Sequence, residues 1–480
     1  MGTVRWTGAG LAVALALAAG CGGGLTMGHG DGGGGADAAD DGLQADAAPA
    51  QSDAAVQDDA APQTDAEPDS TIDFCSAGGP IIQVGDGQNV YEVCTTEIAQ
   101  NVFRNALCTC NNVMLAGYLE THSFDSNLGP PETSLDDSGG AVGIDNHYSI
   151  SAGYTNVGGS LAIAGPQSVS FVGYLEVHGD LFVEATATIA GYTRVRRNAW
   201  FGGNVWSGGL TVDGDVHREG NVYSVQTDIG GTETQEPVAV AKPCDCEPAH
   251  LVDVTSMVDL AQLQNDNAAI GLNPNALKDV LWAAEITLPC GRYYLNAISG
   301  LAKITVNVTG RVALFIGGDL NTAGIVEFKL SPGAEVDIFI KGNLVLAGMG
   351  TFGDKAHPAR TRLYVGGTND ITLIGVGGFV GNVYAPRALV TGVGYVEVYG
   401  SIFARDFVSP GYAYLVYDRA IQQVGEDCPT PEPPAGTCTP CTVCTGGQAC
   451  VGGVCGACSG DADCCGLEVC YNGLCVPLLL

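Results

Sequence analysis

The sequence feature that most constrains this chain is a glycine-centred step that recurs between short apolar runs within residues 310–420. Glycine, then Asp, Asn or Ser, then Leu, Val or Ile occurs at Gly318, Gly342, Gly381 and Gly400. The steps are 24, 39 and 19 residues apart, and 39 is close to two turns of about 20 residues, a length typical of stacked solenoid repeats. The rhythm therefore predicts a parallel β-helix, or β-solenoid, whose interior is filled by aliphatic side chains.

Two blocks of the chain carry this rhythm, residues 141–243 and residues 301–425. In residues 172–185, VGYLEVHGDLFVEA, apolar and polar side chains alternate, which buries one face of a strand and exposes the other. Glycines at the ends of such runs permit the positive φ of tight corners. The predicted fold class is all-β: two solenoid blocks, a small helical insert between them and a disulfide-rich C-terminal tail.

Residues 244–300 interrupt the strand pattern and are predicted to form the helical insert. Four apolar residues recur there at helical spacing, with Asp253 or Thr255 as the N-cap. A second short helix is expected over 276–284. The insert is expected to cap one edge of the coil and to be tied by a disulfide through Cys290. The four apolar residues are Val254, Met257, Val258 and Ala261.

Residues 74–140 precede the first block and are predicted to form a cysteine-containing N-terminal cap. Their pattern is mixed, and one short helix within 97–113 is expected to end at Cys108.

Residues 1–20 have the composition of an export signal. Arg5 is their only charge, and a nine-residue apolar core is too short for a membrane span. Small residues directly before Cys21 resemble the bacterial lipobox, in which the signal is cut before a cysteine that carries lipid. Ala18 departs from the Leu most common in that motif. Because residue 22, directly after the cysteine, is Gly and not Asp, the resemblance implies retention in the outer membrane and not in the inner membrane. The alternative is a plain secretory signal followed by a chance cysteine.

Residues 21–73 are predicted to be a disordered, acidic, Ala/Asp-rich tether. No Lys or Arg lies between Arg5 and Arg104, and low hydrophobicity with charge of one sign disfavours folding. An acidic protein-binding tail is the alternative. The net charge of the whole chain is −33, which disfavours nucleic acid and anionic lipid as partners because both need a cationic face.

The 19 cysteines follow an export signal, which indicates an oxidising compartment and disulfide bonds. Eleven of them lie in residues 426–480, a module with few apolar residues that needs covalent cross-links. Its C-x-x-C-x-x-C run, which begins at Cys438, has the spacing of zinc or iron–sulfur ligands, and so do the C-x-C pairs that begin at Cys108 and Cys244 in the core. An exported chain favours disulfides instead, and no metal or cofactor is expected. The close of the tail resembles the DCC-x4-C-x4-C pattern of cystine-knot miniproteins.

Without the lipidated Cys21, eighteen cysteines remain, eleven in the tail and seven in the core. Full pairing therefore requires at least one bridge between tail and core, for which Cys428 is the expected linker. The alternative is one free thiol in the tail and one in the core. The disulfide candidates are Cys75, Cys94, Cys108, Cys110, Cys244, Cys246, Cys290, Cys428, Cys438, Cys441, Cys444, Cys450, Cys455, Cys458, Cys464, Cys465, Cys470 and Cys475.

Residues 244–421 resemble an uncharacterised β-solenoid domain of myxobacterial surface lipoproteins and pilus-associated proteins. The matching elements are G-N-V-Y-A-P from Gly381, Y-G-S from Tyr399 and V-Y-D from Val416, together with the C-x-C pair and L-P-C-G from Leu288. The resemblance implies an exported, repetitive β domain at the cell surface. It implies no activity and lends no catalytic residue.

Enzymes built on β-helices cut polysaccharides with clustered carboxylates, sometimes with Arg. Asp319 occupies the position of Asn343 and Ser401 in neighbouring repeats, which favours a turn role over a catalytic one. The carboxylates on repeating faces and the arginines near them are Glu176, Glu184, Asp319, Asp337, Asp370, Arg194, Arg196 and Arg197.

The seven histidines are scattered without metal-ligand spacing. Asp145 and His147, beside Tyr148, are a weak candidate site, for which a loop position is the favoured interpretation. No G-x-S-x-G nucleophile motif is present.

The favoured function is a non-enzymatic cell-surface lipoprotein, held to outer-membrane lipid by its acylated N-terminus. Its β-solenoid would serve for display, adhesion or envelope structure, and its 17 tyrosines would offer surfaces to a glycan or a surface protein. A carbohydrate lyase or hydrolase is one alternative. A polymer-forming or pilus-associated subunit is the other, because solenoid ends expose strand edges.

Overall fold

The computed structural model describes residues 75, 81–85, 90–136, 138–346, 349–374 and 379–424, and four short tail strands. The expected signal peptide, the lipidated Cys21, the tether and most of the Cys-rich module lie outside the described residues, as does the expected bridge through Cys428. The tail strands form two antiparallel hairpins: β35 (Ala449–Val451) with β36 (Val454–Gly456), and β37 (Glu468–Tyr471) with β38 (Leu474–Pro477).

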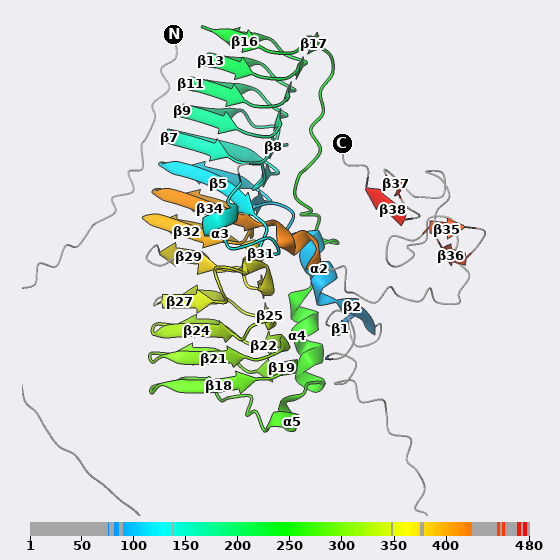
Figure 1. The fold of residues 1–480 in the computed structure, drawn as a ribbon, viewed down its shortest axis with the longest axis vertical. Helices are drawn as coiled ribbons and strands as arrows, with labels where there is room; N and C mark the ends of the chain where they lie inside the picture. Colours follow the sequence, from blue (N-terminus) through cyan, green and yellow to red (C-terminus); the bar gives the residue numbers. More distant parts are fainter. Residues whose placement is uncertain are drawn as a thin grey trace, which may run out of the picture. The chain divides into compact units, whose positions relative to one another are not determined.

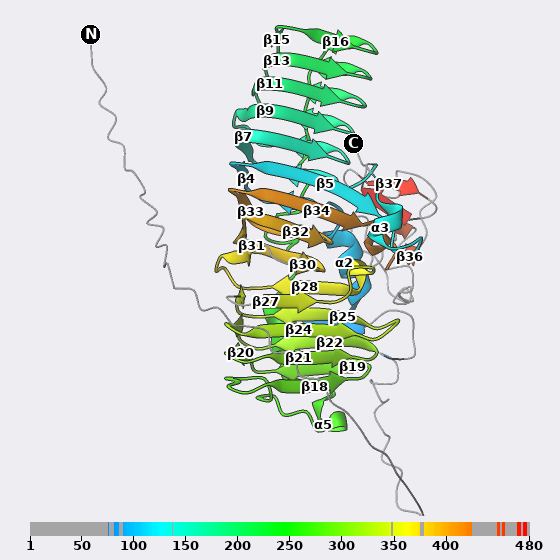
Figure 2. The same cartoon turned by 60° about the vertical axis from the view of Figure 1, so that its left-hand side comes forward.

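The described core is a parallel β-solenoid of about 13 turns, which confirms the predicted fold class. Its lowest coil consists of β18, β19 and β20 (Figures 1 and 2), and most later strands of this block pair in parallel with the strand one coil below. Strands β29 and β30 pair instead with β31 and β32 of the following coil. The strands of this block are β18 (Ala284–Leu288), β19 (Gly291–Leu295), β20 (Ile298–Gly300), β21 (Ile304–Val308), β22 (Arg311–Ile316), β23 (Leu320–Thr322), β24 (Ile325–Leu330), β25 (Glu335–Ile340), β26 (Leu344–Leu346), β27 (Met349–Phe352), β28 (Thr361–Val365), β29 (Ile371–Ile374), β30 (Phe379–Val380), β31 (Asn382–Val393), β32 (Tyr395–Tyr399), β33 (Ile402–Ser409) and β34 (Tyr412–Asp418).

The other block ascends from the middle of the stack to its upper end (Figures 1 and 2). It follows the same parallel pairing, from β6 and β7 up to β15, β16 and β17. Its strands are β6 (Val142–Ile144), β7 (His147–Val157), β8 (Leu161–Ile163), β9 (Val169–Val177), β10 (Leu181–Val183), β11 (Ala187–Val195), β12 (Ala199–Phe201), β13 (Val205–Val212), β14 (Val216–Arg218), β15 (Val222–Ser224), β16 (Thr227–Ile229) and β17 (Glu233–Gln235).

The two blocks are joined into one stack by a coil from the N-terminal region, made of β3 (Leu107–Thr109), β4 (Asn112–Leu115) and β5 (Tyr118–Phe124). On one side β3 and β4 pair with β33 and β5 pairs with β34. On the other side β3 pairs with β6, and β4 and β5 pair with β7. The order of the coils in space therefore differs from their order in the sequence. The last strands of the solenoid, β33 and β34, lie directly below its first coil, β3–β5.

This arrangement corrects the expectation of a separate N-terminal cap over 74–140. Residues 107–124 form an internal coil, and only the segments around it lie against the side of the stack. Those segments are the hairpin of β1 (Ile81–Gly85) and β2 (Val90–Cys94), then α2 (Thr95–Val102), and the short α3 (Pro131–Ser134) after β5. The single helix expected within 97–113 is wrong in its extent, because the chain leaves α2 at Phe103 to enter strand β3.

The interior of the stack is aliphatic and aromatic, as the alternating pattern predicts. Val312, Leu314 and Ile338 are fully buried, and so is almost all of Val383. Phe315, Phe339 and Tyr364 directly follow interior residues in their strands and therefore lie on the opposite face, where α4 (Val254–Leu263) and Phe103 cover them. They stack above one another in three successive coils, and each contributes apolar area whose removal from water stabilises the fold.

The predicted insert is helical only in part. Helix α4 (Val254–Leu263) begins at the N-cap Asp253, whose carboxylate accepts the Ser256 N–H at 3.1 Å, and its four predicted apolar residues are buried. The helix lies along the side of the stack against β19, β22 and β25. Helix α5 (Asn267–Ile270) follows α4 beneath β19, and the 3-10 turns η1 (Pro358–Arg360) and η2 (Arg419–Gln422) lie in the upper half of that block.

The second short helix expected over 276–284 is absent from this described segment. Leu277 and Val280 instead bond to the edge of β20: the Ser299 N–H donates to the Leu277 carbonyl at 2.9 Å, and the Val280 N–H donates to the Ser299 carbonyl at 2.8 Å. Solenoid structure begins here, at Ala284, so that the insert ends earlier than residue 300.

Disulfides tie the N-terminal region to the segment between β17 and α4 and to the lowest coil. Cys108 pairs with Cys244, and Cys110 pairs with Cys246, so that two adjacent disulfide bonds join the two C-x-C motifs. Cys290, which lies within the predicted insert, pairs with Cys75, so a disulfide through Cys290 ties that segment to the N-terminal region, as expected. Cys94 is also disulfide-bonded. No helix of the described residues is long and apolar enough to cross a membrane.

Candidate functional site: a tyrosine row across the coil stack

Six tyrosines occupy the same position in six successive coils. Strand pairing places Tyr395 beside Tyr412, Tyr412 beside Tyr118, Tyr154 beside Tyr174 and Tyr174 beside Tyr192. The pairing of Leu119 with Thr155 puts Tyr118 and Tyr154 in line as well. We call these residues the tyrosine row: Tyr395, Tyr412, Tyr118, Tyr154, Tyr174 and Tyr192.

The rings of the row have two kinds of arrangement. Tyr154, Tyr174 and Tyr192 stack nearly parallel, with centroids 5.3 and 5.7 Å apart, so their ring faces cover one another. Tyr412 meets Tyr118 edge-on at 5.8 Å and Tyr395 at 41° and 5.0 Å. Tyr118 and Tyr395 are 51% and 49% exposed, so this end of the row offers open aromatic area to a ligand.

A second row of side chains runs beside the tyrosines, two residues further along each strand. It places carboxylates in alternate coils, since Glu397 pairs with Tyr414, Tyr414 with Glu120, Glu120 with Asn156 and Asn156 with Glu176. We call Glu397, Tyr414, Glu120, Asn156 and Glu176 the acidic row.

The two rows are joined by hydrogen bonds. The Tyr395 hydroxyl donates to Glu397 at 3.0 Å, and the Tyr412 hydroxyl donates to Glu120. His122 lies 3.0 Å from the same carboxylate of Glu120. Although burial alone would raise the pKa of Glu120, the hydrogen bonds from Tyr412 and His122 bring it below its ordinary value. The centre of the face therefore carries a fixed negative charge.

The tyrosine row depends on a column of glycines that directly precede the tyrosines. A Cβ on Gly173 would lie 1.9 Å from the Gly153 carbonyl oxygen, and a Cβ on Gly153 would lie 1.9 Å from that of Gly117. Both Gly153 and Gly173 have positive φ, at 144° and 127°. The backbones of successive coils thus approach too closely for any other residue, which aligns the tyrosines that follow.

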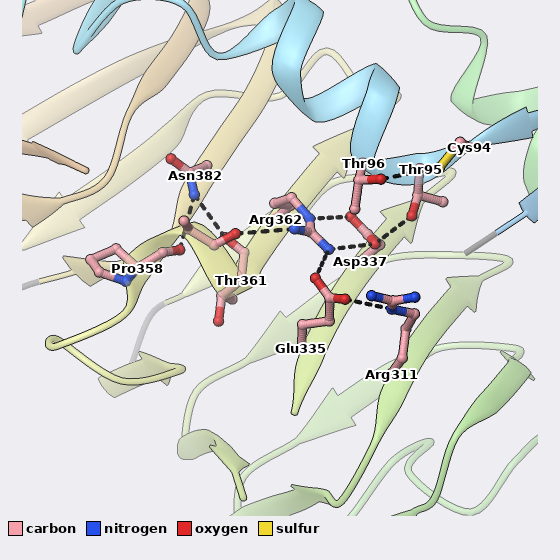
Figure 3. A network of polar contacts seen from close by, with 11 residues as sticks. Cys94, Thr95, Thr96, Arg311, Glu335, Asp337, Pro358, Thr361, Arg362 and Asn382 are labelled. Carbon is pink, nitrogen blue, oxygen red and sulfur yellow. Dashed lines mark hydrogen bonds and ion pairs between the residues drawn. The ribbon is translucent and has the colours of Figure 1, made fainter. Parts of the chain in front are cut away.

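A buried polar network fixes the lower block to the N-terminal region (Figure 3). The guanidinium of Arg362 donates to both oxygens of Asp337, at 2.6 and 2.9 Å, and to Glu335 at 2.8 Å. Thr95, the first residue of α2, donates to Asp337 at 2.8 Å. Burial opposes charge on Glu335, but Arg362 and Arg311 hold the pKa of Glu335 below its ordinary value. Asp337, a candidate catalytic carboxylate, is thus a structural partner of Arg362.

Asp319 has the turn role that its repeat position indicated. Its carboxylate accepts the backbone N–H of Asn343 at 2.7 Å, and the Asn343 side chain accepts the N–H of Asn369 at 3.1 Å. Asp180 and Asn198 make the same contact in the upper block, at 3.0 Å. Such ladders satisfy backbone donors where the chain turns between strands.

The remaining candidates do not assemble into one cluster of carboxylates and arginines. Glu176 pairs with Arg196 at 2.5 Å, while Arg194 pairs with Asp213 and Arg197 with Asp180. Glu184 accepts the Val240 N–H at 2.6 Å, and Asp370 is exposed in the turn before β29.

Asp145, His147 and Tyr148 are not joined into a site either. Tyr148 is fully buried and its hydroxyl bonds to Thr155 at 2.8 Å. One oxygen of Asp145 accepts the Cys244 N–H at 3.0 Å, and burial raises the pKa of Asp145 to about 6. Among the described residues no group of three or more His, Cys, Asp or Glu is placed to hold a metal ion.

The tyrosine row was not among the predicted site residues, although the sequence carries a signal for it. A Gly-Tyr dipeptide occurs at each of the six positions, as in AGYLET, VGYLEV and VGYVEV. The repeats come from both ends of the solenoid sequence, and only the permuted stacking brings them into one column.

The fold and this face define a β-solenoid module. Residues 232–424 match the family model of a domain of unknown function (DUF7305), and this range includes all of residues 244–421, whose motifs indicated an uncharacterised β-solenoid domain. No curated protein matches the chain.

Two solved structures show distant likeness. One is the tapirin C-terminal domain of Caldicellulosiruptor kristjanssonii, at 12% identity and a TM-score of 0.24, over 67% of this chain and 94% of that one. The other is an ice binding protein from an Antarctic bacterium of the Flavobacteriaceae, at 14% identity and a TM-score of 0.18, over 67% of this chain and 98% of that one.

Proposed function

We propose that this chain is a non-enzymatic lipoprotein of the outer membrane whose coil stack displays a glycan-binding face at the cell surface. The export and lipidation part of the proposal rests on the sequence pattern that ends at Cys21. The binding part rests on one observation: six tyrosines from two distant parts of the chain lie in register over six coils, beside a row of carboxylates.

The geometry favours an extended polymer as the ligand. Neighbouring coils are about 4.8 Å apart, so six tyrosines span roughly 24 Å in a straight line. Phenol hydroxyls and carboxylates recognise sugar hydroxyls by hydrogen bonds, and the open rings of Tyr118 and Tyr395 can pack against the apolar face of a sugar. Because Glu120 is held ionised, the face should favour neutral or amino-containing glycans over acidic ones.

Glycan-array and whole-cell binding by the purified mature chain test this proposal. The double variant Tyr118→Ala, Tyr395→Ala is expected to bind at least about tenfold more weakly, because each ring contributes stacking of roughly 1 kcal/mol. Tyr223→Ala is the matched control, since Tyr223 is similarly exposed but pairs with Trp206 outside the row. Equal binding by the double variant and the parent would contradict the proposal.

A glycan hydrolase is the second candidate, because Glu397, Glu120 and Glu176 lie in alternate coils, roughly 10 Å apart by strand spacing. In an inverting enzyme the two carboxyls are about 6.5–9.5 Å apart, and one of them has a raised pKa so that it can donate a proton. The lowered pKa of Glu120 is the opposite condition. Shortening of a bound oligosaccharide, lost on Glu120→Gln, would favour this candidate over simple binding.

A polymer-forming or pilus-associated subunit is the third candidate. Strands β15, β16 and β17 pair with a coil on one side only among the described residues, which leaves a strand edge at the upper end of the stack. Asp228 and Glu233 lie on this edge and disfavour stacking of a second acidic chain. Sedimentation of the mature chain as a monomer at high concentration would exclude this candidate.

A further inference from the structure

The lowest coil of the stack exposes three large apolar side chains together. Leu281 is 68% exposed, Trp282 is 84% exposed and Leu301 is 71% exposed. They lie where the chain enters β18 and leaves β20, and the Leu301 N–H donates to the Val280 carbonyl at 3.0 Å, which holds the two segments side by side. We call Leu281, Trp282 and Leu301 the apolar corner. Exposed groups of this kind usually mark a binding surface.

The apolar corner is held on a fixed turn. Leu277 is fully buried, and Val280 forms a parallel bridge with Gly300. Between them Asp279 has a φ of 56°, and its N–H and carboxylate both bond to the Ser299 hydroxyl, at 2.8 and 3.0 Å. A non-glycine residue in this conformation is costly, so the turn is maintained by its surroundings. The structure therefore keeps Leu281 and Trp282 directed into solvent.

The charges beside the apolar corner balance. Lys278 and Lys303 are exposed there, together with the carboxylates of Asp279 and Glu285. In a chain of net charge −33 this is a locally neutral surface, which presents no electrostatic barrier to a lipid headgroup layer. Tryptophan is also the side chain that favours the membrane interface, where its ring meets both headgroups and acyl chains.

The start of the described chain is attached to the same coil. Cys75 is bonded to Cys290, which lies between β18 and β19. Residues 1–74, with the apolar segment and Cys21 of the predicted lipid anchor, therefore join the stack at its lowest coil. The proposed lipid anchor is therefore connected, through its tether, to the same coil that carries the apolar corner.

We propose that the apolar corner inserts into the interface of a lipid bilayer and seats the lowest coil on the membrane. The proposal draws on the proposed lipid anchor for its setting, but insertion is a property of Leu281, Trp282 and Leu301 and is measured without the lipid.

The experiment uses the mature chain from residue 21 to residue 480 with Cys21→Ser, so that neither lipid nor signal peptide contributes. Its partition onto phosphatidylcholine vesicles is measured by flotation, and its tryptophan fluorescence is measured with brominated lipid. Trp282→Ser is expected to lower the partition coefficient on the order of tenfold, as loss of one buried aromatic side chain implies. Trp206→Ser is the matched control, because Trp206 is exposed in β13 near the other end of the stack.

Quenching by brominated lipid in the parent and in Trp206→Ser, but not in Trp282→Ser, would support insertion. No vesicle binding by the parent, or equal binding by Trp282→Ser, would overturn it. Trp282 is so exposed that its replacement should leave the thermal unfolding temperature unchanged, which excludes misfolding as the cause. Glycan binding by the tyrosine row and acylation of Cys21 are measured separately, so either can fail without the other result changing.

Discussion

Tyr412 of β34 and Tyr118 of β5 face each other edge-on in neighbouring coils, with ring centroids 5.8 Å apart, although nearly the whole solenoid sequence separates them. The Tyr412 hydroxyl also donates to Glu120, two residues beyond Tyr118. The junction between the two blocks is therefore part of the candidate binding face. Any change that loosens this junction should weaken ligand binding as well as stability.

The two disulfides between the C-x-C motifs are expected to stabilise the fold redundantly, because both close nearly the same loop. Both close loops of 136 residues, so either bond alone restricts the unfolded chain almost as much as the two together. Cys108→Ser with Cys244→Ser should cost less than about 1 kcal/mol, whereas removal of both bonds should cost about 3–5 kcal/mol. Urea unfolding at equilibrium measures both free energies. Equal, additive losses from the two bonds would contradict the shared-loop explanation.

Arg362→Leu is expected to be strongly destabilising. The change leaves Asp337 and Glu335 buried without their cation, a condition that costs about 3–5 kcal/mol. Arg362→Leu combined with Asp337→Leu should recover part of the loss. Arg311→Ala, which removes a partly exposed partner of Glu335, should cost about 1 kcal/mol or less. Urea unfolding gives the order, and a loss for Arg362→Leu no larger than that for Arg311→Ala would show that the network is not needed.

Asp145 should lower stability as the pH rises from acid toward neutral. Burial raises its pKa to about 6, while an unfolded aspartate has a pKa of about 3.9. Between these values the folded chain binds the proton more tightly than the unfolded chain, so the free energy of unfolding falls as pH rises through the window and then levels off.

Asp145→Asn should therefore stabilise the protein progressively from pH 4 to pH 7, by about 1–3 kcal/mol at the upper end. The asparagine oxygen can still accept the Cys244 N–H. Asp370→Asn, at an exposed carboxylate, is the control. Urea unfolding at intervals of one pH unit measures the difference, and a difference that does not vary with pH would show that Asp145 stays ionised throughout.

Gly173→Ala is expected to break the register of the upper coils. Its new methyl group would meet the Gly153 carbonyl at 1.9 Å, and the residue also has a positive φ, so a loss of several kcal/mol is expected, of order 3. Gly392→Ala is the matched control, because its nearest neighbours lie at 3.5 Å and the backbone there is not strained. Thermal unfolding and the glycan-binding assay should both respond to Gly173→Ala, and parent-like stability would refute the close-packed glycine column.

Much of the fold could be predicted from the sequence. Buried Val312 and Leu314, the turn role of Asp319 and the N-cap at Asp253 all follow from patterns within a few residues. The helix expected over 276–284 was wrong because Leu277 and Val280 bond to β20, a tertiary contact that outweighs local helical spacing.

The candidate site could not be predicted in the same way. Tyr118 and Tyr395 come from opposite ends of the solenoid sequence, and their alignment depends on how β5 pairs with β34. Backbone hydrogen bonds between parallel strands are the same for almost any residue, so the sequence of one strand does not identify its partner.

By itself the sequence determined that this chain winds into coils, because alternating apolar residues must be buried and glycine corners let the backbone turn. The tertiary structure alone decided the order of the coils, with residues 107–124 placed between the end of one block and the start of the other. That order is set by long-range strand pairing and by disulfides between distant cysteines, which are interactions that no local pattern encodes.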